Sequence, residues 1–143
     1  MNEENGVFSS IEDAIADIRN GKMVVVVDDR ERENEGDIVV AAERVTADDV
    51  NFMVRFARGL VCVPISPEQA ERLRLQHMVP DSTERHGTAF TVSVDAKEGT
   101  TTGISAEERA LTARLLANPD AKPEDFLRPG HIFPLIGDRK SVV

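Results

Sequence analysis

The sequence predicts an α/β or α+β sandwich in which a mixed β-sheet is flanked by helices. Helical and strand patterns alternate along the chain, without an internal repeat or a low-complexity linker. The length of 143 residues and an ordinary apolar content allow one domain with a sizeable core. We therefore expect a single domain in which helices cover a mixed sheet.

Composition excludes several classes of partner. The net charge of −9 leaves no basic surplus for nonspecific binding to DNA or RNA. No apolar run approaches the roughly 20 residues of a membrane span, and the acidic start Met-Asn-Glu-Glu-Asn is unlike a signal peptide. A single cysteine, Cys62, excludes an internal disulfide and is typical of a reducing compartment. We expect a cytoplasmic protein without nucleic-acid or membrane partners.

The first part of the chain predicts one helix and two strands. Ser9 or Ser10 can cap a helix that Asn20-Gly21 ends. Its apolar residues are spaced to form one stripe: Ile11, Ala14, Ile15 and Ile18. Residues 23–27 and 38–42 are short, apolar and rich in β-branched side chains. Both are expected to be buried strands.

A second helix, a third strand and a short helix follow. Thr46 caps a helix that Gly59 closes, with an apolar face of Val50, Met53, Val54 and Ala57. Residues 60–65 predict a strand, in which Pro64 indicates an edge or a bulge. Ser66-Pro67-Glu68-Gln69 is a capping box with proline at the first helical position, and it predicts a helix ending near Leu73. Residues 74–87 have no clear period; His77 and His86, in this stretch, are more often structural residues than ligands.

The remaining elements surround two segments that can carry chemistry. Residues 88–94 alternate as a strand does. Ser105 and Glu108 predict a capping box that opens a helix reaching Ala117, where Asn118-Pro119 stops it. Residues 128–135 contain two prolines and a glycine, which predict irregular backbone around His131.

Residues 28–37, Asp-Asp-Arg-Glu-Arg-Glu-Asn-Glu-Gly-Asp, place a dense cluster of charge between the first two expected strands. A solvated charged loop is the ordinary interpretation of such a run. Two details favour a binding site here. Gly36 has no Cβ and so permits backbone conformations that other residues disfavour. Arginines alternate with glutamates, so one ligand can contact both cations and carboxylates. In an extended segment the alternate carboxylates fall on one side, which suits magnesium holding a phosphorylated or hydroxylated substrate. The spacing leaves both interpretations open.

Two further segments are candidates for ligand binding or catalysis. Residues 99–105 offer threonine hydroxyls and backbone N–H groups at a helix start, which can cradle a phosphate. The alternative is a turn with threonines on its surface, and the threonine triplet alone is weak support for phosphate binding. His131 lies in a segment stiffened by proline, and histidine is the residue type that ordinarily changes charge near physiological pH. It is the best candidate for a general acid or base, with a buried structural histidine as the alternative.

Five motifs, in this order, closely resemble the 3,4-dihydroxy-2-butanone 4-phosphate synthase family of riboflavin biosynthesis. The resemblance extends from about Phe8 to Ile136. The motifs are the acidic segment 28–37, Gly-Leu-Val-Cys-Val-Pro-Ile at 59–65, His-Gly-Thr-Ala-Phe-Thr-Val-Ser-Val-Asp at 86–95, Thr-Thr-Thr-Gly-Ile-Ser at 100–105 and Arg-Pro-Gly-His-Ile-Phe-Pro-Leu at 128–135.

The resemblance implies a lyase that depends on magnesium or manganese and converts D-ribulose 5-phosphate into formate and L-3,4-dihydroxy-2-butanone 4-phosphate. It implies a homodimer with active sites near the interface. His131, Asp37 and Cys62 are implied as catalytic residues, and Glu33 as a metal ligand. The implied substrate-binding residues are Arg32, Glu33, Asp37, Thr101 and Thr102.

The resemblance also implies that the chain is the N-terminal two-thirds of such a domain. Family members continue with an Arg-Gly-Gly-His-Thr-Glu-like motif and a later glutamate, which supply a metal-binding histidine and a catalytic carboxylate. We expect residues 1–137 to be the synthase domain. Residues 138–143 match the translation of a common sequencing adapter, and we expect them to be a non-native tail.

Three functional hypotheses follow. In the first, the chain is part of the synthase and is impaired as a catalyst. In the second, it is a noncatalytic module that binds a sugar phosphate, and in the third it is a dimerisation fragment without a ligand. The sequence leaves open whether the intact gene also encodes a GTP cyclohydrolase II domain.

Overall fold

The computed structural model describes residues 8–31 and 33–137, and it contains two small sheets surrounded by helices. The helices are α1 (Ile11–Arg19), α2 (Ala47–Phe52), α3 (Pro67–Arg72) and α4 (Ala106–Ala117), with 3₁₀ turns at Ala42–Arg44 and Pro123–Asp125 and a π-helical turn at Met53–Ala57. The strands are β1 (Val24–Val27), β2 (Gly36–Val39), β3 (Cys62–Ile65), β4 (Val94–Ala96) and β5 (Phe126–Ile136).

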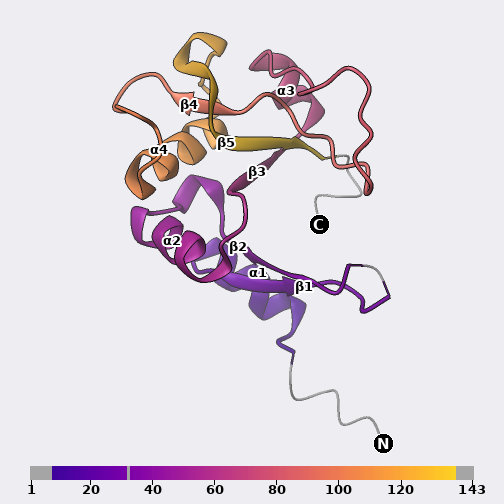
Figure 1. Cartoon of the computed structure of the whole chain (residues 1–143). Helices are drawn as coiled ribbons and strands as arrows, with labels where there is room; N and C mark the ends of the chain where they lie inside the picture. Colours follow the sequence, from indigo (N-terminus) through magenta and orange to yellow (C-terminus); the bar gives the residue numbers. More distant parts are fainter. Residues whose placement is uncertain (1–7, 32, 138–143) are drawn as a thin grey trace, which may run out of the picture.

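A mixed sheet is the centre of the fold, as the sequence predicted. Its strand order is β3-β5-β4, with β3 parallel and β4 antiparallel to β5. Pro64 lies on β3, which is an edge strand. Proline is tolerated there because the sheet does not need a hydrogen bond from its missing N–H. Strands β1 and β2 form a separate antiparallel hairpin, which lies with α1 on one side of the molecule while β5, α3 and α4 lie on the other (Figure 1).

The hydrophobic core lies between the mixed sheet and its helices. Its fully buried residues come from α2, β4, α4 and β5, and from Leu73 at the end of α3. They include Val50, Leu73, Val94, Ala110, Leu116 and Ile132, each with 0% exposure. The packing fixes the position of β5 relative to both neighbouring strands.

The predicted helix starts are largely confirmed. Ser10 caps α1, and Thr46 and Ser66 form capping boxes with Asp49 and Gln69. At α4 the prediction was half wrong. Ser105 accepts a hydrogen bond from the Glu108 N–H, but the Glu108 carboxylate turns away to the preceding loop instead of returning to the cap.

The hairpin and α1 are far more exposed than predicted. Val25 of β1 is 68% exposed, and no residue of α1 is buried, although the helix has the predicted apolar stripe. Ile11 alone is 74% exposed. The prediction of a buried first strand is therefore wrong for this chain, because nothing in the described part of the chain covers that surface.

Two predictions in the second half of the chain are wrong in extent. Residues 88–94 do not form a strand; β4 begins only at Val94, because the amides of Thr91 and Val92 bond to two different segments. Residues 128–135, expected to be irregular, lie within the long strand β5. Pro129 is tolerated because the β4–β5 register shifts between Val94 and Asp95, which leaves Pro129 and Gly130 in a bulge.

No helix among the described residues is long and apolar enough to cross a membrane.

Candidate active site

Asp28 organises the acidic loop that joins β1 to β2. Its Oδ2 accepts a hydrogen bond of 2.9 Å from the Glu33 N–H, and its Oδ1 accepts one of 2.9 Å from the Glu35 N–H. The Asp28 N–H in turn donates to the Glu35 carbonyl. The Asp28 side chain therefore stabilises the folded conformation of the loop by accepting hydrogen bonds from its backbone.

The loop is folded, whereas the proposed one-sided row of carboxylates requires an extended segment. Asp29 Oδ1 accepts a hydrogen bond from the Glu31 N–H, and Asn34 has a positive φ of 54°. Of the glutamates, Glu33 is half-buried while Glu31 and Glu35 are exposed. Arg32, predicted to bind substrate, lies outside the described residues.

Glu33 connects this loop to a distant segment. Its Oε1 lies 3.3 Å from Nδ1 of His86, in the segment that precedes β4. Within the described part of the chain, no group of three or more His, Cys, Asp or Glu side chains is arranged to hold a metal ion. Magnesium usually keeps several waters and needs only one or two protein carboxylates, so Glu33 fits as one ligand and does not complete a site by itself.

Cys62 and Asp37 interact electrostatically between the two sheets. Cys62 is half-buried at the start of β3, next to Phe133 of β5. Burial raises the pKa of the Cys62 thiol, and the negative charge of Asp37 raises this pKa further. The thiol is therefore protonated at neutral pH, which excludes a thiolate nucleophile at rest.

His131 lies on β5, on the same face of the strand as Phe133. Phe133 is the strand partner of Cys62. His131 Nδ1 lies 2.8 Å from Asp95 Oδ2, and the His131 N–H donates a 2.8 Å hydrogen bond to Asp95 Oδ1. The side chain of His131 is 41% exposed and that of Asp95 is 9% exposed.

The close approach of β5 to β4 depends on Gly130. A Cβ at this position would overlap the main chain of Val94 and Asp95. The Gly130 N–H also donates a 3.1 Å hydrogen bond to Ser93 Oγ. Only glycine allows the bulge to bring the next residue, His131, against Asp95.

The threonine loop, defined here as residues 99–105, is held by the carboxylate of Glu108. Its Oε2 accepts a 3.0 Å hydrogen bond from the Gly103 N–H, while Oε1 accepts from the hydroxyl and the N–H of Thr101. The expectation of free N–H groups for a phosphate is thus wrong for these two amides. Thr101 and Thr102 border a cavity of about 390 Å³, which Glu107 and Glu108 make acidic and Arg114 partly balances.

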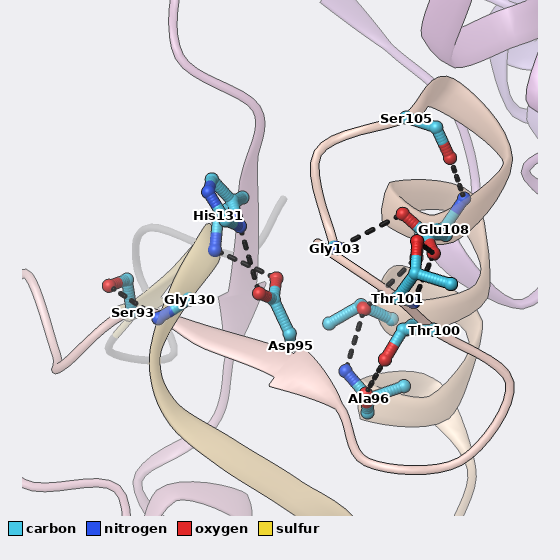
Figure 2. A network of polar contacts seen from close by, with 11 residues as sticks. Ser93, Asp95, Ala96, Thr100, Thr101, Gly103, Ser105, Glu108, Gly130 and His131 are labelled. Atoms are coloured by element: carbon cyan, nitrogen blue, oxygen red, sulfur yellow. Dashed lines mark hydrogen bonds and ion pairs between the residues drawn. The ribbon is translucent and has the colours of Figure 1, made fainter.

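The structure brings the five motifs together in two groups. Asp37 lies near Cys62, and Glu33 contacts His86, so the acidic loop meets two of the other motifs. His131, Asp95 and the threonine loop form the second group (Figure 2). The family model for 3,4-dihydroxy-2-butanone 4-phosphate synthase matches residues 12–143.

The chain belongs to this family. It is 59% identical over 130 residues to the riboflavin biosynthesis protein RibBA of Aquifex aeolicus, covering 90% of this chain and 32% of that protein. It is 53% identical over 129 residues to the 3,4-dihydroxy-2-butanone 4-phosphate synthase of Candida albicans, covering 90% of this chain and 63% of that enzyme.

Solved structures of the synthase family agree with the fold. A crystal structure of 3,4-dihydroxy-2-butanone 4-phosphate synthase in complex with two magnesium ions matches with a TM-score of 0.91 and 51% identity, over 93% of this chain and 62% of that one. The resemblance found from the motifs and the α+β fold with a mixed sheet are both confirmed. The chain spans less than two-thirds of the length of these relatives.

Sequence reasoning did not select three residues that the structure places against the predicted ones: Asp95, His86 and Glu108. Asp95 could have been recognised from the sequence, because it is an acidic residue at the end of an apolar, alternating segment. An aspartate at such a position is rarely buried unless it has a partner. For Glu108 the cap pattern was found, but sequence spacing did not show where its carboxylate points. Nothing in the sequence pairs His86 with Glu33.

Proposed function

We propose that the protein has the activity of its family and converts D-ribulose 5-phosphate into L-3,4-dihydroxy-2-butanone 4-phosphate and formate, as a lyase of riboflavin biosynthesis. The observation that carries this proposal is the agreement of sequence and fold with the crystallised synthase, at 51% identity and a TM-score of 0.91. We further propose a homodimer acting in the cytoplasm. The exposed valines of β1 support self-association, since an apolar surface of this kind favours a protein partner.

Enolisation of a ketose requires a base beside a polarised carbonyl, and the later skeletal rearrangement requires stabilised oxyanions. In the proposal, His131 transfers protons, and Asp37 holds substrate hydroxyls or moves a proton between them. The neutral thiol of Cys62 contacts the substrate as a weak donor. Asp37 is exposed on β2, which leaves its carboxylate accessible.

Glu33 is proposed to hold the divalent cation, magnesium or manganese, together with water and substrate oxygens. The ion supplies positive charge that polarises a carbonyl. Arg32, Glu33, Asp37, Thr101 and Thr102 are proposed to bind the substrate. The Thr102 hydroxyl is the proposed donor to the phosphate, because the Thr101 hydroxyl and the Thr101 and Gly103 amides donate to Glu108.

The test is a formate-release assay with ribulose 5-phosphate and magnesium, run on this 143-residue chain beside the Candida albicans relative. If the chain is active, Glu33→Gln and Asp37→Asn should each lower kcat/KM by about 10²-fold or more, because each removes a charge used in the reaction. Asp48→Asn, an exposed acid on α2, is the matched control and should leave the rate unchanged.

Calorimetric titration with ribulose 5-phosphate distinguishes the remaining outcomes. Binding without formate release indicates a noncatalytic sugar-phosphate module. Absence of both binding and turnover, with an active relative in the same assay, contradicts the proposed function for this chain.

A further inference from the structure

Asp95 is a buried carboxyl group whose two oxygens are both paired with His131. It is 6% exposed, and within the described part of the chain no lysine or arginine pairs with it. An ionised carboxylate is costly to bury unless hydrogen-bond donors replace its water. Both oxygens of Asp95 are directed at His131, one at the backbone N–H and the other at the ring.

This arrangement determines the tautomer of His131. An ionised carboxylate only accepts hydrogen bonds, so Nδ1, at 2.8 Å from Oδ2, must carry the proton that it donates. The lone pair of the neutral imidazole is then on Nε2. The second bond, to the backbone N–H, fixes the position of Asp95 relative to the ring. The ring therefore has one orientation and one basic nitrogen.

The threonine loop covers the other side of the carboxylate. Gly103 is buried with a φ of +81°, and a Cβ there would overlap the Asp95 carboxyl group. Main chain thus lies directly against Asp95, where a side chain would push the carboxylate away. Glu108 keeps the loop in this position through the Gly103 N–H and the Thr101 hydroxyl, as Figure 2 shows.

We propose that Asp95 is a positioning residue that holds His131 in the Nδ1–H tautomer, so that Nε2 is the nitrogen that exchanges protons with the substrate. The threonine loop, held by Glu108, lies against the Asp95 carboxylate and keeps it in place. This role deepens the proposed function and rests on it for its catalytic meaning. The tautomer itself is a property of the resting protein.

Nitrogen-15 NMR of the three histidine side chains tests the tautomer without any turnover. Spectra of protein labelled with ¹⁵N-histidine are recorded at a pH where the imidazoles are neutral, and His77→Gln and His86→Gln identify the His131 signals by elimination. We expect a protonated Nδ1 and an unprotonated Nε2. A wild-type His131 protonated at Nε2 would overturn the proposal, whatever the variants do.

The variant Asp95→Asn keeps the side-chain size and removes the charge. Its amide can donate to Nδ1, so the His131 signals should change to the Nε2–H pattern, whereas Asp48→Asn should leave them unchanged. A folded Asp95→Asn protein, judged by its backbone amide spectrum, that keeps the Nδ1–H pattern contradicts the proposal. If Asp95→Asn does not fold, Asp95→Glu provides the second comparison and should retain a carboxylate-held Nδ1–H.

Catalysis gives an independent readout if the formate assay shows activity. Asp95→Asn should then lower kcat by about 10²- to 10⁴-fold with little change in KM, and adding it to His131→Gln should cost little more, because both residues act as one unit. A raised KM with an unchanged kcat contradicts the positioning role. If the chain shows no formate release, the proposed function fails while the NMR result still decides the tautomer.

Discussion

At the scale of single residues, two positions show how the site is controlled by what surrounds it. Cys62 is a thiol made less acidic by burial and by Asp37, and Gly130 is a glycine required by the approach of two strands. Neither property follows from the residue type alone. Each leads to a prediction that a single substitution can test.

The reactivity of Cys62 should be low and should depend on Asp37. Since its pKa is raised above the ordinary 9.0, little thiolate exists at neutral pH, and alkylation by iodoacetamide should be slower than for an unstructured cysteine peptide. Asp37→Asn should speed the reaction at neutral pH by lowering this pKa, with burial remaining the larger effect. Alkylation rates measured from pH 7 to 10 test this, and Asp48→Asn should change nothing. Equal rates for the wild type and Asp37→Asn would contradict the electrostatic contact.

Gly130→Ala should destabilise the fold by about 1–3 kcal/mol or more, because its Cβ would overlap the main chain of Val94 and force β5 away from β4. Gly59→Ala is the matched control: a Cβ there meets nothing within 4 Å, so the free energy of unfolding should change little or rise slightly. Urea unfolding followed by circular dichroism measures both. Similar midpoints for the two variants would show that the strands can separate at little cost.

At the scale of elements, the start of α4 and the threonine loop act as one unit. Ser105 caps the helix, while Glu108, one turn into it, holds the loop that precedes the cap. The hydrogen bond from the Thr101 N–H is the main cause that lowers the pKa of Glu108 below its ordinary value of 4.5, followed by the Thr101 hydroxyl. The loop is therefore linked to the protonation of one carboxyl group.

This linkage predicts opening of the loop in acid. Because the pKa of Glu108 is lowered in the folded state, its ionised carboxylate stabilises the fold. This contribution is complete at a pH above the ordinary glutamate pKa of 4.5, and it is lost as the pH falls through the lowered folded-state pKa. The amides of Thr101 and Gly103 should lose protection from hydrogen exchange in that range. Glu108→Gln should lack this pH dependence, while Glu107→Gln, an exposed neighbour, should retain it. Protection that is independent of pH in the wild type would disprove the linkage.

At the scale of the whole molecule, the chain consists of a well-packed part and a poorly covered part. The core lies between the mixed sheet and its helices, whereas α1 has no buried residue and the valines of β1 face solvent. Exposed apolar surface of this kind favours aggregation or association with a partner. The hairpin carries Asp37 and the acidic loop, so this part of the candidate site lies on the poorly covered part.

Hydrogen exchange should show this difference directly. Amides of β1 and β2 should exchange faster than those of β5 in native conditions, because few buried contacts resist opening of the hairpin. Exchange followed by mass spectrometry on peptides from the two regions measures the difference. Equal protection at a protein concentration too low for association would mean that the hairpin is as stable as the core.

The sequence by itself determined the family and the cap residue of each α-helix. Family motifs and helix caps depend on residue types at short, fixed spacings, which can be read directly from the chain. The mixed sheet also followed from the alternation of helical and strand patterns. Tertiary structure alone decided that the first strand is exposed, that residues 128–135 are a bulged strand, and that Glu108 binds the threonine loop. It also decided that Asp95, 36 residues before His131 in the chain, is the partner of that ring. Burial and pairing depend on segments far apart in sequence, and only the folded chain brings them together.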